Sequence, residues 1–116
     1  MHNYKELKVW QQAIPLATEV YRITKDFPKE EKYGLTSQIQ RSAVSIPSNI
    51  AEGAGRNGAA EFKLFLGYAA GSSCELETQL IITQALLYLD NSKAEELIKA
   101  SNNIQKMLYA LLKSVA

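Results

Sequence analysis

Side chains able to do acid–base, nucleophilic or metal chemistry are scarce in this sequence. The chain has one histidine, His2, and one cysteine, Cys74. A Cys–His nucleophilic pair would have to join these two distant residues, a zinc site needs clustered Cys and His ligands, and a helical di-iron site needs a Glu-x-x-His motif on each of two helices. Because none of these sets is present, we predict that the protein is not an enzyme and uses no metal or cofactor.

Basic side chains recur at spacings that could contact phosphate groups. Lys99, Lys106 and Lys113 follow one another every seven residues, on one face of a predicted helix, and Arg41 and Arg56 begin and end a second polar row. The net charge is only +1, from 13 basic and 12 acidic residues, whereas nucleic-acid-binding domains usually show a basic excess. The lysine row is therefore either a solvated helix face or a phosphate-contacting surface formed when several copies align. We take all five residues as candidate nucleic-acid-binding residues.

The polar row of the second predicted helix has two interpretations. Ser45, Asn49 and Glu52 lie between the two arginines at helical steps, beside several small residues. They could form a buried polar network that fixes helix register, or a recognition surface that is exposed in the assembly. We favour the structural interpretation, because Ser and Asn side chains pair well with backbone groups at a proline kink and Pro47 lies within the row.

The segment from Gly53 to Gly58 has the letters of the dinucleotide-binding pattern G-x-G-x-x-G. That pattern indicates a nucleotide site only between a strand and a helix. Here a helix precedes it and no strand is predicted, so we interpret the segment as an interhelical loop. A weaker alternative is that the amides opening the next helix hold a phosphate together with Arg56.

Four helices position these side chains in the predicted fold. The chain has 116 residues, of which 47% are hydrophobic and 22% charged, as expected for one globular domain over residues 1–116. Apolar periodicity predicts helices from Asn3 to about Phe27, over about 36–53, over about 59–89, and from Ser92 onward. Short connections between long helices imply antiparallel neighbours, so we predict an all-α, antiparallel up-down four-helix bundle.

Local signals define the ends and bends of these helices. Asn3 with Glu6, and Ser92 with Glu95, have the capping-box spacing of a helix start. Pro15 and Pro47 lie inside helical patterns and predict kinks. The motif Gly67-x-x-x-Gly71 predicts a close helix crossing. We expect an inward stripe on the third helix, which consists of Phe62, Phe65, Ala69, Ser73, Leu76, Leu80, Thr83 and Leu87.

The first helix carries an apolar face too wide for a single helix seam. One row comprises Leu7, Trp10, Ile14, Ala17, Tyr21 and Thr24, and the other comprises Val9, Ala13, Leu16, Val20, Ile23 and Phe27. We expect one part of this face to pack in the bundle and the margin to contact another copy. Trp10 and Tyr21 are the candidate oligomer-interface residues.

The sequence favours a cytoplasmic location. A lone cysteine cannot form an internal disulfide. The N-terminus has no apolar signal core. No apolar run reaches the roughly 18 residues of a membrane helix, so we expect no membrane partner.

Several motifs together resemble one family. They are Leu7-Lys8-Val9-Trp10, Phe27-Pro28, Tyr33-Gly34-Leu35-Thr36, Ser45-Ile-Pro-Ser-Asn-Ile-Ala-Glu-Gly53, Phe62-x-x-Phe65-Leu66 and Gly71-Ser72-x-x-Glu75-Leu76-Glu77. With these motifs the chain resembles the four-helix-bundle proteins typified by bacterial 23S ribosomal RNA intervening-sequence proteins, which are related to accessory variability proteins of retroelements. The resemblance covers nearly the whole chain, and the segment from Ser45 to Gly53 is its most specific part.

The resemblance implies a ring-forming homo-oligomer, commonly a pentamer, without enzymatic activity. It also implies an accessory role linked to RNA or DNA, in the context of ribosomal RNA or a retroelement. The near-neutral charge favours an alternative, in which the protein is an interaction scaffold that recruits a protein partner without binding nucleic acid.

Overall fold

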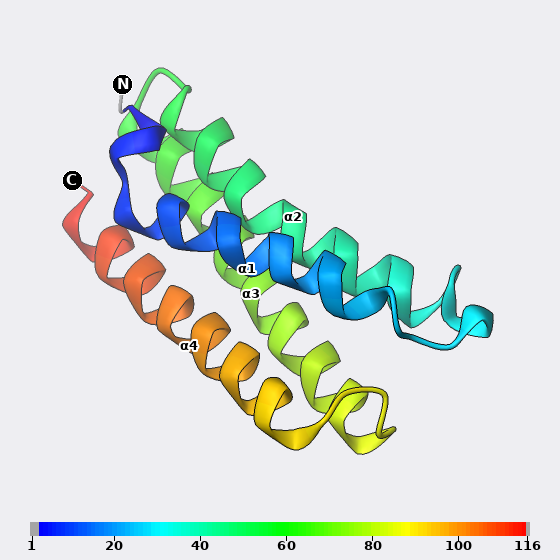
Figure 1. Ribbon diagram of the computed structural model, residues 1–116. Coiled ribbons are helices and arrows are strands. Elements are labelled where there is room, and N and C mark those ends of the chain that lie inside the picture. Colours follow the sequence, from blue (N-terminus) through cyan, green and yellow to red (C-terminus); the bar gives the residue numbers. More distant parts are fainter. Residues whose placement is uncertain (1–2, 116) are drawn as a thin grey trace.

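The computed structural model describes residues 3–115, which form a bundle of four antiparallel helices (Figure 1). The helices are α1 (Lys8–Thr24), α2 (Leu35–Ala54), α3 (Ala59–Ala85) and α4 (Asn91–Ser114), and the short 3-10 turns are η1 (Tyr4–Glu6) and η2 (Lys29–Glu31). The bundle measures 43 × 24 × 19 Å. The start of α1 and the end of α4 lie at the same end of the bundle as the α2–α3 connection (Figure 1). The predicted all-α up-down fold is confirmed.

The two apolar rows of α1 have different environments. Every member of the row from Val9 to Phe27 is buried, whereas in the other row only Ala17 and Thr24 are buried and Ile14 and Tyr21 are exposed. The buried row packs on isoleucines of α2 and leucines of α3 and α4, so it supplies the hydrophobic burial that stabilises the bundle. In the other row, Tyr21 lines a groove against α2, whereas Leu7 and Ile14 line spaces against α4.

Helices α2 and α3 approach closely at Gly53. A Cβ atom added to Gly53 would lie 2.7 Å from the Cβ of Phe65 and 3.3 Å from the Phe62 carbonyl oxygen. Gly67 and Gly71, in contrast, are exposed, and a Cβ added at either would meet nothing within 4 Å. The close crossing predicted at the Gly67–Gly71 motif is therefore wrong within this chain, because these glycines face outward.

Both predicted capping boxes are wrong in detail. The Asn3 side chain accepts a hydrogen bond from the Lys5 amide at 3.2 Å, but it caps η1, and α1 begins only at Lys8. The residue that caps α4 is Asp90, whose side chain accepts from the Lys93 amide at 2.9 Å. Asp and Ser are both strong N-cap residues, and the chain enters α4 two residues before Ser92. Helices α1 and α2 continue through Pro15 and Pro47.

Helix α3 ends four residues before the predicted end. Leu87 adopts a left-handed conformation with φ of 62°. Its amide donates to the Gln84 carbonyl and the Tyr88 amide donates to the Thr83 carbonyl, both at 3.1 Å, which is a Schellman ending. Leu87 was expected to face inward, yet it is 83% exposed. Glycine usually occupies this position, so the sequence lacks the usual signal for the end.

Candidate nucleic-acid interface

A groove between α1 and α2 surrounds Arg41. Its volume is about 490 Å³, within the range of roughly 300–1,000 Å³ that is common for ligand sites. We call it the Arg41 groove, and define it by Tyr21 of α1 and by Ser37, Gln40, Arg41, Val44, Ser45 and Ser48 of α2.

The helical period of α2 brings these residues to one face. Ser37, Arg41, Val44 and Ser48 follow one another at steps of four and three, and all four are exposed. Gln40 and Ser45 lie deeper and bond to neighbouring helices. The Gln40 amide donates to the Thr24 hydroxyl of α1 at 2.9 Å, and the Ser45 and Ser72 hydroxyls of α2 and α3 lie 2.9 Å apart.

The three arginines of the chain differ in their ion pairs. Arg22 pairs with Glu19 at 3.0 Å. Arg56 pairs with Glu52 at 2.9 Å and with Glu61 at 3.4 Å, and its guanidinium carbon lies 4.9 Å from the centre of the Phe65 ring. Arg41 forms no ion pair or hydrogen bond through its side chain within residues 3–115. Of the two arginines predicted to contact nucleic acid, only Arg41 therefore has an uncommitted charge.

The lysine row lies on the exposed surface of α4. Lys99, Lys106 and Lys113 are all exposed, and none of them forms an ion pair with another described residue. From Leu97 to the end of the chain the sequence has these three lysines and no acidic residue. The part of α4 from Leu97 onward is therefore locally basic in a nearly neutral protein.

The predicted polar row of α2 consists mainly of structural contacts. Besides the bond from Ser45 to Ser72, the Asn49 amide donates to the Ser45 carbonyl oxygen at 2.8 Å. Glu52 bonds to Arg56 one turn later. A recognition role for Asn49 and Glu52 stays a prediction, as does a phosphate contact by Arg56.

The two candidate interface residues occupy different surroundings. Trp10 is half-buried, and its ring meets Tyr4 edge-on at 5.2 Å between ring centres. Tyr21 is 44% exposed and lies in the Arg41 groove. Sequence reasoning assigned Tyr21 and Arg41 to separate surfaces and did not propose Ser37 or Ser48 as site residues. The signal that could have identified this groove was the recurrence of polar residues from Ser37 to Ser48 at helical steps, together with Tyr21 in the partly exposed row of α1.

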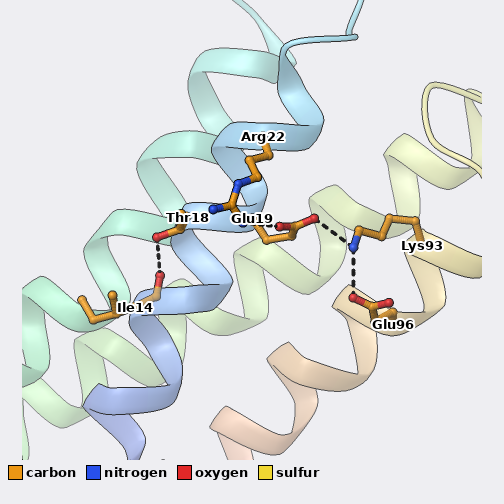
Figure 2. A network of polar contacts seen from close by, with 6 residues as sticks. All are labelled: Ile14, Thr18, Glu19, Arg22, Lys93 and Glu96. Atoms are coloured by element: carbon orange, nitrogen blue, oxygen red, sulfur yellow. Dashed lines mark hydrogen bonds and ion pairs between the residues drawn. The ribbon is translucent and has the colours of Figure 1, made fainter.

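A second groove, of about 650 Å³, lies between α1 and α4 and has balanced charges. Lys93 pairs with Glu19 of α1 at 2.8 Å and with Glu96 at 3.1 Å (Figure 2). Hydrogen bonds from Lys93 and then Arg22 lower the pKa of Glu19, and the bond to Glu19 raises the pKa of Lys93. These pairings balance the charges of the groove, and the bond from Lys93 to Glu19 connects α4 to α1.

Other chemistry has little support in the described structure. Within residues 3–115, no three His, Cys, Asp or Glu side chains gather as a metal site would require. His2 lies outside the described residues. Cys74 is exposed, with its sulfur 3.7 Å from the Gln105 side-chain oxygen. No helix in the described part is both long and apolar enough to cross a membrane.

Comparison with known proteins identifies relatives of this fold. A family model described as 23S rRNA-intervening sequence protein matches residues 5–110. A solved structure from Bacteroides thetaiotaomicron, a protein of unknown function from the S23 ribosomal protein family, is also similar. It is 26% identical, the match covers 91% of this chain and 96% of that chain, and the TM-score is 0.85. No curated protein matches the chain.

Proposed function

Since the chain belongs to the 23S rRNA-intervening sequence protein family, we propose that it is a non-catalytic, homo-oligomeric accessory protein that contacts RNA or DNA through basic patches multiplied by symmetry. The observation that carries this proposal is the state of four basic side chains. Arg41, Lys99, Lys106 and Lys113 are exposed and form no ion pair with a described residue. Phosphate groups can bind these cations without displacing a carboxylate.

Oligomer formation accounts for binding by a nearly neutral chain. A net charge of +1 gives one copy little long-range attraction for nucleic acid. Linked weak sites can gain about 10²–10⁴-fold in affinity without new contacts. Association is supported by large apolar side chains of α3 that are about half exposed, namely Leu64, Tyr68, Ile81, Ile82 and, just after the helix, Leu86. We propose a ring, with the pentamer as the expected number of subunits.

The test is binding to structured RNA, single-stranded DNA and duplex DNA across a salt series, measured by fluorescence anisotropy with the oligomeric mass determined on the same sample. We expect binding that weakens steeply with salt, because phosphate contacts release counterions. Replacing Lys99, Lys106 and Lys113 with alanine should reduce the salt slope by about 2 on a single strand, at about 0.7 for each lost contact.

The matched control replaces Lys25, Lys29 and Lys32, which are three exposed lysines around the α1–α2 connection. It removes the same charge from another surface and should leave the slope nearly unchanged. Equal losses in the two triple variants would show general charge attraction, and absence of binding by the intact oligomer at low salt would contradict the proposal.

A protein-interaction scaffold is the second candidate function. The large, half-exposed apolar side chains of α3 favour it, because apolar surface is often used for protein contacts. An intact oligomer that binds no nucleic acid at low salt would place this candidate first.

A further inference from the structure

We propose that the Arg41 groove binds one nucleotide unit of a single-stranded nucleic acid, with its phosphate on Arg41 and its base stacked on Tyr21. This inference rests on the proposed function and adds the class of strand and the place where it is recognised. It joins two residues that sequence reasoning had placed on different surfaces.

The polar groups of the groove divide into two sets. Gln40 and Ser45 are held by bonds to α1 and α3. The side chains of Ser37, Arg41 and Ser48 make no hydrogen bond with any residue in 3–115, and neither does the Tyr21 hydroxyl. The second set therefore presents one guanidinium and three hydroxyl groups to solvent, beside Gln40 and Ser45, which are held by their bonds. A guanidinium fork matches phosphate geometry, and hydroxyl groups add neutral donors.

The charge in this groove favours an anion. None of the lining residues is acidic, so Arg41 is its only ionised group. The groove between α1 and α4 has two cations and two carboxylates in its wall. An anion that enters the Arg41 groove meets an unopposed positive charge, whereas one that enters the other groove meets charges that are already paired.

Tyr21 makes the groove specific for an unpaired base. Its ring is 44% exposed and makes no ring contact with another aromatic residue in the described chain. Bases in a single strand can present a face to an aromatic side chain, while bases in a duplex are stacked on each other. Arg41 and Tyr21 line the same space of about 490 Å³, so phosphate and base contacts can come from one nucleotide.

The experiment compares labelled oligouridylate of about 12 nucleotides, a length within the range of single-strand sites, with an RNA duplex of the same length. Arg41→Ala and Tyr21→Ala should each weaken oligouridylate binding by about tenfold, as expected from loss of a stacking or phosphate contact. Tyr21→Ala should change duplex binding much less, and Tyr21→Phe should restore single-strand binding because it keeps the ring. Linear polyphosphate should displace oligouridylate from the wild-type protein and from the Tyr21→Ala protein equally, because it has phosphate groups and no base.

Arg22→Ala and Tyr33→Ala are the matched controls. Arg22 is already paired with Glu19, and Tyr33 is 88% exposed in the α1–α2 connection, outside the groove and away from the lysine row. Both should bind oligouridylate like the wild type. Oligomeric mass is measured for every variant, so that a lost interface is not mistaken for a lost binding site.

The outcomes separate the inference from the proposed function. If the lysine-row variant loses binding while Arg41→Ala and Tyr21→Ala bind oligouridylate normally, the groove inference is overturned and the function stands. If Tyr21→Ala changes the oligomeric mass, the groove is covered by another copy and the inference is overturned. Failure of the wild-type oligomer to bind any nucleic acid overturns both.

Discussion

At the scale of single residues, hydrogen-bond and ion-pair partners separate structural polar groups from free ones. Arg41 and Arg56 are both exposed residues of the same polar row, yet only Arg56 is paired. The sequence contains part of this distinction. Glu52 precedes Arg56 by one helical turn, which is a favourable ion-pair spacing, whereas no acidic residue lies within four positions of Arg41. The pairing of Arg56 could be predicted in this way, and so could the absence of a local partner for Arg41.

The Ser45–Ser72 bond predicts an energetic coupling between α2 and α3. Ser72 is only 8% exposed, so Ser45→Ala leaves its hydroxyl without the partner 2.9 Å away. We expect each single alanine variant to lower the free energy of unfolding by about 1 kcal/mol. The double variant should lose clearly less than the sum, because its second substitution removes a group that is already unpaired. Urea denaturation of the four proteins measures the coupling, and strict additivity would contradict it.

At the scale of secondary-structure elements, the sequence predicts helices well and some of their ends poorly. Helix α2 was predicted within one residue at each end, because the Gly34 and Gly55 breakers are adjacent to it. The end of α3 was placed too late, since Leu87 occupies a left-handed position that the sequence pattern does not reveal. The sequence offers two residues that can cap the start of α4, Asp90 and Ser92. Asp90 is the cap in the structure, because the chain enters the helix directly after it leaves the end of α3.

Glycine substitutions test the packing between elements. Gly53→Ala places a methyl group 2.7 Å from the Phe65 Cβ, so we expect overpacking to cost about 1–3 kcal/mol of unfolding free energy. Gly71→Ala adds its methyl group to open space in a helix interior, and should stabilise the fold by about 0.5–1 kcal/mol.

Thermal or urea denaturation distinguishes the two variants by the sign of their effect, with the oligomeric mass checked alongside. Stabilisation by Gly53→Ala would mean that α2 and α3 are not held at this separation. A loss of oligomeric mass in Gly71→Ala would place the open face of α3 in an interface between copies.

At the scale of the whole molecule, the bundle was predictable and the groove was not. Apolar periodicity is a property of each helix alone, and four amphipathic helices with short connections have few compact arrangements. The Arg41 groove depends on how α1 and α2 are rotated against each other. That rotation is set by packing of the row that includes Val9 and Val20, and it turns Tyr21 toward α2. The periodicity of each helix taken alone does not reveal such a juxtaposition.

The contact between α1 and α4 also depends on the whole molecule, because it joins the first helix to the last. These two helices pack less closely than the other neighbouring pairs. Lys93 of α4 bridges to Glu19 of α1 at 2.8 Å, and the two side chains are 30% and 24% exposed (Figure 2). We expect Lys93→Met, which keeps most of the aliphatic stem, to lower the melting temperature at neutral pH. Lys99→Met, at an exposed and unpaired position of the same helix, should have little effect.

The effect of Lys93→Met should depend on pH in a direction fixed by the two pKa shifts. The pKa of Glu19 lies below its ordinary value of 4.5, so its contribution to stability is present above that value and is lost as the pH falls through the lowered pKa. The pKa of Lys93 lies above its ordinary value of 10.5, so its contribution is lost only as the pH rises through the raised pKa. The difference in melting temperature between wild type and Lys93→Met should therefore be constant between these limits and shrink in acid.

High salt at pH 7 should reduce this difference as well, because both groups are partly solvated. Circular dichroism melts across this pH range measure the difference, and an equal difference in acid would mean that Lys93 acts through packing of its stem instead of its charge.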